Sequence, residues 1–282
     1  GNSSTKKIPL RIRIFLLIFF SILFILIMLP FYAISLASFK PGEDLIRYGL
    51  NLRFDLNVMS FDNFKFLFTG DHSYFLWFRN SMILTIVQVS LVLFFSAFVS
   101  YGFAAYEFKG KNFLFICVLL IMMVPFEILL LPLYKLIFDL RMINTYSAIV
   151  VPGLANAGTI FFFRQYLRGI PGAIIDSGRV DGATEYGIFF RLILPIMKPS
   201  FAAMGILNGM NSWNNFLWPF IVLSDGNKFT LPMGLKTLLT PYGNNYDLLI
   251  VGSFFAILPI FILFLMFQKY FIDGMTAGAV KG

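Results

Sequence analysis

The sequence predicts an all-α polytopic membrane protein. Its mean hydropathy is +0.82, 59% of its 282 residues are hydrophobic and only 13% are charged, whereas a soluble domain carries about 25% charged residues. Several apolar stretches exceed the roughly 18 residues that mark a membrane-spanning helix. Six such windows are found, at residues 12–37, 81–106, 113–137, 146–167, 199–223 and 248–271.

Each window is long enough to cross a hydrocarbon core of ~30 Å at ~1.5 Å per residue. The first is not expected to be a signal peptide, because the apolar run from Ile14 to Leu36 is too long for one. Prolines inside the windows are expected to kink the helices rather than end them, because neighbouring helices can satisfy the freed carbonyls. These prolines are Pro30, Pro125, Pro132, Pro152, Pro219 and Pro259.

The lysine and arginine residues predict the orientation. With six spans, both termini and the 107–112 and 164–198 loops share one side, which carries 13 basic and 5 acidic residues against 9 and 9 on the other. The positive-inside rule assigns the basic side to the cytoplasm. The expected divisions are a cytoplasmic N-terminus (1–11), a first span with an external loop (12–80), a five-helix core (81–272) with a cytoplasmic loop (168–198), and a cytoplasmic tail (273–282).

Composition argues against catalytic and metal-binding functions. The single cysteine, Cys117, lies in an apolar run and the single histidine, His72, lies in a polar segment, so neither predicts a metal site or a catalytic triad. The chain has no phosphate-binding loop of the Gly-x-x-x-x-Gly-Lys-Ser/Thr type. The basic residues form no stripe interleaved with aromatic residues, so nucleic-acid binding is not predicted. We therefore expect no catalytic residue, metal or cofactor on this chain.

The 168–198 loop carries the most specific pattern in the sequence. Pro171 is suited to the first turn of a short helix, and Gly182 is suited to its end because glycine accepts a positive φ. Thr184 can then cap a second helix that leads to Pro195. The loop is therefore predicted to be a helix, a glycine turn and a second helix, which could dock in the groove of a partner.

This loop resembles the EAA loop of the permeases of binding-protein-dependent ATP-binding-cassette (ABC) importers. The resemblance rests on Asp176-x-x-x-x-Asp181-Gly182-Ala183 and on Leu192-x-Leu194-Pro195 downstream. It departs from the family where Asp176-Ser177-Gly178 replaces Glu-Ala-Ala, and Gly178 should weaken the helix by roughly 1 kcal/mol relative to alanine. The resemblance implies that the loop docks on an ATPase subunit through Asp176, Arg179, Asp181, Gly182, Ala183, Leu194 and Pro195.

Downstream segments narrow the resemblance to the sugar-importing, MalG-like branch of this family. They are Asn211-Ser212-Trp213-Asn214-Asn215-Phe216-Leu217-Trp218-Pro219, Thr230-Leu231-Pro232-x-Gly234-Leu235 and the tail 274–282. The branch implies the type I (MetI-like) importer fold and a tail that contacts the ATPase, here through Thr276, Gly278 and Lys281. By position, Tyr242, Gly243 and Asn244 correspond to the external loop that contacts the solute-binding protein.

The resemblance also implies the partners and the mechanism. A second permease chain, two ATPase subunits that bind ATP and Mg²⁺, and an extracytoplasmic solute-binding protein would complete an importer in the bacterial cytoplasmic membrane. Specificity would rest largely with the binding protein, so the identity of the sugar stays open. A secondary transporter or channel is the main alternative, although ionisable residues at mid-membrane are scarce here. A membrane-embedded enzyme is the second alternative.

Polar residues inside the spans are candidates for a sugar path, because a polar group in a membrane usually faces a cavity or another helix. Amides can both donate to and accept from sugar hydroxyls. Trp213 and Trp218 could stack on sugar rings or anchor helix ends at the membrane surface. Asp181 could contact the ATPase or only balance Arg179. The candidate path residues are Gln88, Asn156, Asn208, Asn211, Trp213, Asn214 and Asn215.

Overall fold

The computed structural model describes residues 9–240 and 243–276. It is built almost entirely of helices, which confirms the all-α prediction. The chain divides into two compact units, which we call unit 1 (residues 1–72 and 237–256) and unit 2 (residues 73–236 and 257–282). The last helix contributes its first part to unit 1 and its second part to unit 2.

Unit 1 contains the first long apolar helix, two short helices, a small strand pair and the start of the last helix. Asn63 is buried and its side-chain amide donates to the carbonyls of Ser38 (3.2 Å) and Lys40 (2.7 Å), which ties the second short helix to the end of the first long one. The elements are α1 (Leu10–Ser38), α2 (Gly42–Tyr48), α3 (Asp62–Thr69), β1 (Leu239–Thr240), β2 (Gly243–Asn244) and the first part of α15 (Tyr246–Thr276). The two strands pair antiparallel, with Leu239 opposite Asn244.

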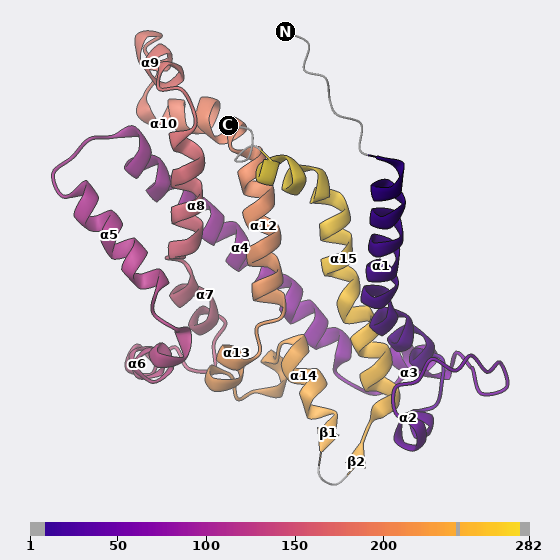
Figure 1. The fold of residues 1–282 in the computed structure, drawn as a ribbon. Helices are drawn as coiled ribbons and strands as arrows, with labels where there is room; N and C mark the ends of the chain where they lie inside the picture. The colour runs from indigo at the N-terminus through magenta and orange to yellow at the C-terminus, as the bar shows by residue number, and fades with distance from the viewer. Residues whose placement is uncertain (1–8, 241–242, 277–282) are drawn as a thin grey trace. The chain divides into compact units, whose positions relative to one another are not determined.

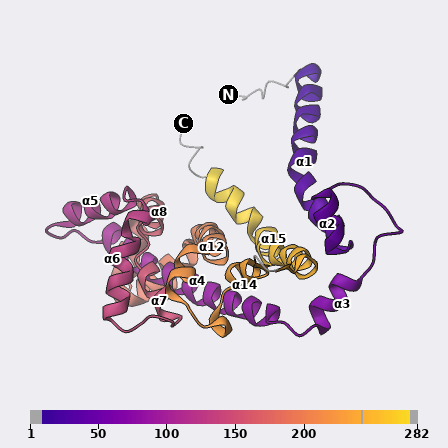
Figure 2. The same ribbon diagram turned by 90° about the horizontal axis from the view of Figure 1, so that it is seen from below.

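Unit 2 is a helical bundle in which α4 (Tyr74–Ala105) packs against α8 (Ala157–Arg168) and α12 (Lys198–Trp213) (Figures 1 and 2). The other elements before α12 are α5 (Lys111–Met122), α6 (Phe126–Asp139), α7 (Ser147–Gly153), α9 (Ala173–Val180), α10 (Glu185–Ile188), the π-helical turn η1 (Phe189–Ile193) and α11 (Leu194–Ile196). After it come α13 (Leu217–Val222), the 3-10 turn η2 (Gly226–Lys228), α14 (Leu231–Thr237) and the second part of α15.

Two apolar clusters lie at opposite ends of α4. One gathers Leu84 of α4 with residues of α6, α7, α13 and α14, among them Trp218, whose indole N–H donates to the carbonyl of Ala148 at 2.9 Å. The other gathers Ala97 and Tyr101 of α4 with residues of α8, α10, η1 and α12. The chain segments at each end of α4 are therefore held by separate cores.

Among the described residues, α1, α4 and α15 are each long and apolar enough to cross a membrane. The number rises to six if each of three bent helix pairs is one span. These pairs are α5 with α6, α7 with α8, and the 185–196 helix with α12, and they bend by 104°, 41° and 74°. The windows read from hydropathy therefore locate the apolar segments, but windows 113–137 and 146–167 are broken helices, and the third bent pair begins at Glu185, inside the loop predicted at 168–198, rather than in window 199–223.

Pro125 ends a helix, although we expected it only to kink one. Helix α5 stops at Met122, and Pro125 has an extended conformation (φ −59°, ψ 135°) immediately before α6. A proline disfavours helical geometry in the residue before it, so a complete break is a direct consequence. The other five prolines of the apolar windows lie within helices, as expected: Pro30, Pro132, Pro152, Pro219 and Pro259.

The boundaries of other windows also differ from those predicted. Helix α4 begins at Tyr74 rather than near residue 81, because polar residues in its first turns are still helical. The window 199–223 is interrupted after Trp213, where Asn214 ends α12 with its side-chain amide donating to the carbonyl of Met210 at 3.0 Å. An amide that binds the helix's own backbone competes with helix continuation, which hydropathy alone cannot detect.

Candidate functional site

The loop between α8 and α12 has the helix–turn–helix form predicted from its sequence. Helix α9 ends at Val180, and Gly182 follows with a φ of +75°, a left-handed conformation that favours glycine. Thr184 caps the next helix, with its hydroxyl oxygen accepting from the N–H of Gly187 at 3.1 Å. Glycine and threonine therefore have the local roles expected of them. Figure 1 places α9 and α10 at one end of α4.

Gly178 lets α9 pack closely on the segment that follows it. This glycine is buried, and a Cβ there would lie 2.9 Å from Leu192 Cδ1 and 3.0 Å from Ile188 Cγ1. Ile188 is itself fully buried. The loss of helix propensity at Gly178 is thus accompanied by a close approach between α9 and α10–η1. The departure from Glu-Ala-Ala at this position has a packing explanation.

A single carboxylate joins the two sides of the glycine turn. Arg179 donates to Glu185, with Nε–Oε1 of 2.8 Å and Nη2–Oε2 of 3.4 Å, and also pairs with Asp176 at 3.4 Å. Tyr106 donates its hydroxyl to Glu185 Oε2 at 2.6 Å, and Tyr101 approaches the same oxygen at 3.4 Å. We call Arg179, Glu185, Tyr101 and Tyr106 the turn cluster.

The ionisation of the turn cluster follows from these hydrogen bonds. Those from Arg179, and then from Tyr106, hold the pKa of Glu185 below its ordinary value. The hydrogen bond to Glu185 in turn raises the pKa of Arg179. Burial, and then the hydrogen bond to Glu185, raises the pKa of Tyr106, so that its hydroxyl keeps the proton it donates. At neutral pH the cluster is therefore an ion pair with an additional neutral donor.

The sequence pattern did not identify Glu185 as a site residue. An acidic residue directly after an N-cap threonine is typical of any first helical turn, where it complements the helix dipole. Because this local role accounts for Glu185, nothing in the sequence indicated further contacts. Its tyrosine partners are 79 and 84 positions away in the chain, so no local pattern could have indicated them. Asp181, which could have balanced Arg179, forms no ion pair with it within the residues that the structure describes.

The outer surface of the loop remains available to a partner. Val180 is 87% exposed and Tyr186 is 68% exposed, and Asp176, Asp181, Gly182 and Ala183 are exposed beside them. Large exposed apolar side chains outside the spanning helices are typical of an interaction surface. Val180 and Tyr186 therefore join the predicted contact residues.

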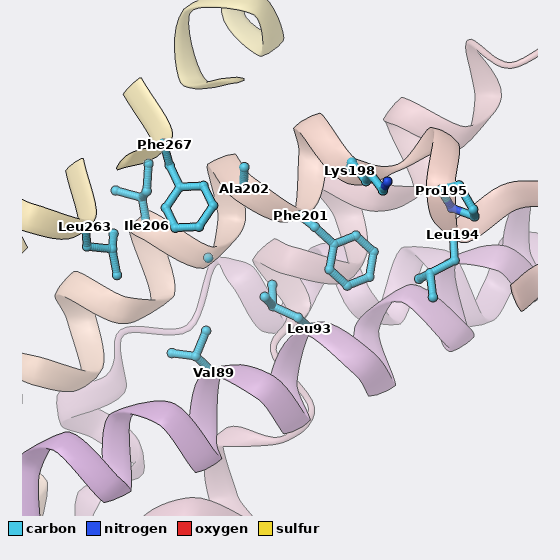
Figure 3. Close-up of a pocket in the computed structure, with 11 residues that line it drawn as sticks. Val89, Leu93, Leu194, Pro195, Lys198, Phe201, Ala202, Ile206, Leu263 and Phe267 are labelled. Atoms are coloured by element: carbon cyan, nitrogen blue, oxygen red, sulfur yellow. The ribbon is translucent and has the colours of Figure 1, made fainter. Parts of the chain in front are cut away.

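Leu194 and Pro195 lie apart from that surface. They line one end of an apolar groove of about 650 Å³ between α4, α11–α12 and the second part of α15 (Figure 3). Val89 and Leu93 of α4 line the same groove, and Lys198 is the one charged side chain among the described residues that line it. The Leu-Pro part of the motif is thus packed on the bundle, whereas the Asp-Gly-Ala part is presented to solvent.

Two of the candidate path residues are joined in a buried network. Asn208 of α12 donates to Thr159 Oγ1 at 3.0 Å and to the carbonyl of Met204 at 2.8 Å. Asn156 caps α8, with its side-chain oxygen accepting from the N–H (2.8 Å) and the hydroxyl (2.9 Å) of Thr159. These two asparagines connect α12 to the start of α8, Asn208 through its amide nitrogen and Asn156 through its side-chain oxygen.

The other path candidates cluster near the end of α12. Gln88 of α4 accepts from the hydroxyl of Ser212 at 3.1 Å. Asn211 and Asn214 are exposed and Asn215 is half-buried. Trp213 is buried and meets Phe78 edge-on at 5.4 Å. Trp213 and Trp218 are both core residues of unit 2, so neither alternative considered for them describes their packing. Among these candidates, Asn211 and Asn214 are the most accessible.

The predicted external and tail sites are described only in part. Gly243 and Asn244 form β2, and Asn244 donates to the hydroxyl of Tyr246 at 2.9 Å. Thr276 is the last residue of α15. Tyr242, Gly278 and Lys281 lie outside the described residues. No group of three or more His, Cys, Asp or Glu side chains within the described ranges could hold a metal ion.

Comparison with known proteins identifies the family. Residues 96–277 match the family described as "Binding-protein-dependent transport system inner membrane component". The arabinooligosaccharides transport system permease protein AraQ of Bacillus subtilis (strain 168) is 54% identical over 270 residues, which are 96% of each chain. The lactose transport system permease protein LacG of Rhizobium radiobacter is 35% identical over 204 residues, 72% of this chain and 74% of LacG.

A solved structure supports the same fold. A chain of a bacterial ABC transporter involved in the import of alginate superposes with a TM-score of 0.82 over 95% of this chain and 100% of that chain, at 19% identity. The two chains therefore share an all-α fold. The family match covers most of the chain, including the helix–turn–helix loop, the turn cluster and α12. The chain therefore belongs to the family of binding-protein-dependent transport system inner membrane components.

Proposed function

We propose that this chain is a membrane-spanning permease subunit of an ABC importer that moves a sugar across the bacterial cytoplasmic membrane. The observation that carries the proposal is the loop between α8 and α12. It presents a short helix and a positive-φ glycine to solvent, while Gly178, Ile188 and the turn cluster hold it on the bundle. A projecting element held in this way can receive force from a partner and pass it to the spanning helices.

The substrate class is supported by the names of the relatives. Chains at least 30% identical to this one include permeases named for arabinooligosaccharide, lactose and galactooligosaccharide transport. Because the arabinooligosaccharide permeases reach 54% identity over at least 90% of this chain, a short arabinose-containing oligosaccharide is the first substrate to test. Asn211 and Asn214 offer exposed amides that could contact its hydroxyls.

The partners follow from the same proposal. A second permease chain would complete the pathway, and two ATPase subunits on the cytoplasmic side would bind ATP and Mg²⁺, so that this chain itself needs no cofactor. A solute-binding protein would dock on the external side, where Tyr242, Gly243 and Asn244 are expected. The excess of lysine and arginine on the loop side supports cytoplasmic termini and a cytoplasmic loop.

The mechanism is an equilibrium between two access states of the spanning bundle. ATP binding draws the ATPases together and displaces the docked loop, and the loaded binding protein biases the same equilibrium from outside. Each ligand can shift the equilibrium only by its differential affinity for the two states. Asp176, Arg179 and Asp181 are positioned near the docking face, and the tail from Thr276 through Gly278 and Lys281 is proposed to make a second contact.

The loop proposal is tested in the assembled importer with Gly182→Glu. We expect loss of ATPase association or of sugar-stimulated ATP hydrolysis, because the substitution adds both a charge and backbone strain at the exposed turn. Gly49→Glu is the matched control, since Gly49 also has a positive φ (+65°) and a Cβ there also meets nothing within 4 Å, but it lies outside the loop. Unchanged transport and ATPase coupling in Gly182→Glu would show that the loop is not the coupling element.

The tail is tested by deleting residues 274–282. We expect membrane insertion and permease pairing to persist, while sugar-stimulated ATP hydrolysis falls. Wild-type stimulation in a correctly assembled truncation would remove the tail from the coupling interface.

A further inference from the structure

Three long apolar helices are found among the described residues, and of these only α4, with 32 residues, contains no proline. The two others, α1 and α15, each contain one. Sharp helix bends usually occur at proline, at Gly/Ser pairs or at π-bulges. At ~1.5 Å per residue, α4 is a rod of about 48 Å. Both of its ends hold segments that lie far away in the sequence.

At the loop end, Glu185 is the point where three segments meet. Arg179 brings α9 to it, Glu185 itself begins α10, and Tyr101 and Tyr106 belong to the last turns and the C-cap of α4. Hydrogen bonds to an ionised carboxylate are about twice as strong as those between neutral groups. One side chain thus connects both halves of the loop to α4.

The apolar contacts beneath Glu185 make this connection stiff. Phe189 is 1% exposed, and its ring lies 5.2 Å from that of Tyr101 and 4.8 Å from that of Phe98, both on α4. Ile188 and Ile193 are fully buried in the same cluster. Close-packed interiors have low compressibility and transmit displacement. The loop and the end of α4 therefore move together.

At the opposite end, α4 holds the segment that contains η2 and α14. The side-chain amide of Asn80 donates to the carbonyls of Asn227 (2.9 Å) and Phe229 (3.0 Å), and the hydroxyl of Ser81 accepts from the N–H of Leu231 at 2.7 Å. Figure 1 shows α4 running from the end of unit 2 that carries α9 and α10 to the end that carries α14.

From these contacts we infer that Glu185 is a positioning residue that joins the coupling loop to α4, and that α4 carries the displacement of the loop to the η2–α14 segment at the other end of the bundle. This inference rests on the proposed function, because it needs the loop to receive force from an ATPase. In this inference the turn cluster is the joint between the loop and α4, to which Tyr101 and Tyr106 contribute from the α4 side. Asn80 and Ser81 connect α4 to the η2–α14 segment at the far end.

The joint is tested in the full importer in proteoliposomes with the Tyr101→Phe/Tyr106→Phe variant. It removes both hydroxyl donors to Glu185 but leaves the Arg179–Glu185 ion pair, so the loop keeps its shape. We expect the sugar transported per ATP hydrolysed to fall about three-fold or more, a range typical of substitutions along a coupling route. ATPase association should not change. Glu107→Gln is the control, because Glu107 is a neighbouring carboxylate, 91% exposed, that pairs with Lys111 rather than with Arg179.

A second measurement follows the far end directly. In a Cys117→Ala background, Asn227→Cys places an accessible thiol beside the contact with Asn80. We expect ATP to change its labelling rate in the parent, and this change to disappear in the double tyrosine variant. A purely structural role would lower thermal stability and leave the ATP-dependent change in place.

The outcomes separate this inference from the proposed function. Normal coupling and normal ATP-dependent labelling in the tyrosine variant, with coupling lost in Gly182→Glu, would overturn the joint and leave the importer function standing. Intact coupling in Gly182→Glu would instead count against the loop as the coupling element.

Discussion

Arg179 and Glu185 pair across the turn at Gly182, with the guanidinium Nε 2.8 Å from the carboxylate Oε1. The two residues are six positions apart and belong to different helices, so the pair joins α9 to α10 across the turn. Both side chains are about 40% exposed, and solvent therefore weakens the pair. The contribution of Glu185 to the stability of the folded protein therefore depends on the additional hydrogen bond from Tyr106.

The ionisation of Glu185 predicts how this contribution depends on pH. Its pKa is lower in the folded protein than in the unfolded chain, first because of Arg179 and then because of Tyr106. The folded state therefore binds this proton less readily, and the stabilisation is complete above the ordinary glutamate pKa of about 4.3. It is lost as the pH falls through the lower, folded value.

The measurement compares the thermal unfolding of wild type and Glu185→Gln in detergent. We expect a constant difference in stability across neutral pH and a smaller one in acid below the ordinary glutamate pKa. A difference that instead grows as the pH falls would show that the carboxylate is not held ionised by its partners.

Replacing Gly182 with alanine should destabilise the loop without causing a clash. A Cβ there meets nothing within 4 Å, so the cost is the positive φ alone, about 1–2 kcal/mol. Gly182→Asn should cost less, because asparagine tolerates the left-handed region better. Protease sensitivity of the loop measures the effect. Gly172→Ala is the control, since that position is equally open but has φ −56°, and equal effects at both glycines would contradict the prediction.

Gly234→Ala should destabilise the end of the bundle opposite the loop. A Cβ on Gly234 would overlap the indole of Trp77, which is buried, and overpacking of this kind costs about 1–3 kcal/mol. Trp77→Leu alone should also destabilise the protein. In a double-mutant cycle of thermal unfolding, the combined variant should lose less than the sum of the two. Strict additivity would show that the two side chains do not compete for the same space.

The asparagines of α12 should separate into structural and transport roles. Asn208→Leu removes a buried bond to Thr159, and hydrogen bonds between spanning helices contribute about 1 kcal/mol. We expect lower thermal stability with the KM for sugar unchanged. Asn211→Ala removes an exposed amide, so we expect unchanged stability and a higher KM. Uptake kinetics beside thermal unfolding test both, and the reverse assignment of effects would contradict the division.

Much of the candidate loop could be predicted because its signals are local. Gly182 and Thr184 act within three residues of themselves, one through backbone conformation and the other through a cap, and both have the predicted form. Gly178 illustrates the limit of this approach. Its low helix propensity is visible in the sequence, whereas its close approach to Ile188 and Leu192 appears only when α9 packs on the following segment.

The partners of the polar residues in the spans were harder to predict from the sequence. Their type predicts a need for partners, because an amide inside a membrane must be satisfied. It does not say whether the partner is a sugar or another helix. Asn208 bonds to Thr159, 49 positions away, while Asn211 three residues later is exposed. That difference depends on which face of α12 meets α8.

The sequence by itself determined the helical membrane class, the apolar segments, the charge asymmetry and the helix–glycine–helix loop. Each of these depends on composition or on interactions within a few residues, where backbone sterics and hydrophobicity act directly. Only the tertiary structure decided where the apolar segments bend, that Trp213 and Trp218 are buried, and that Glu185 meets Tyr101 and Tyr106. These features require side chains distant in the chain to become neighbours, and no local pattern specifies that neighbourhood.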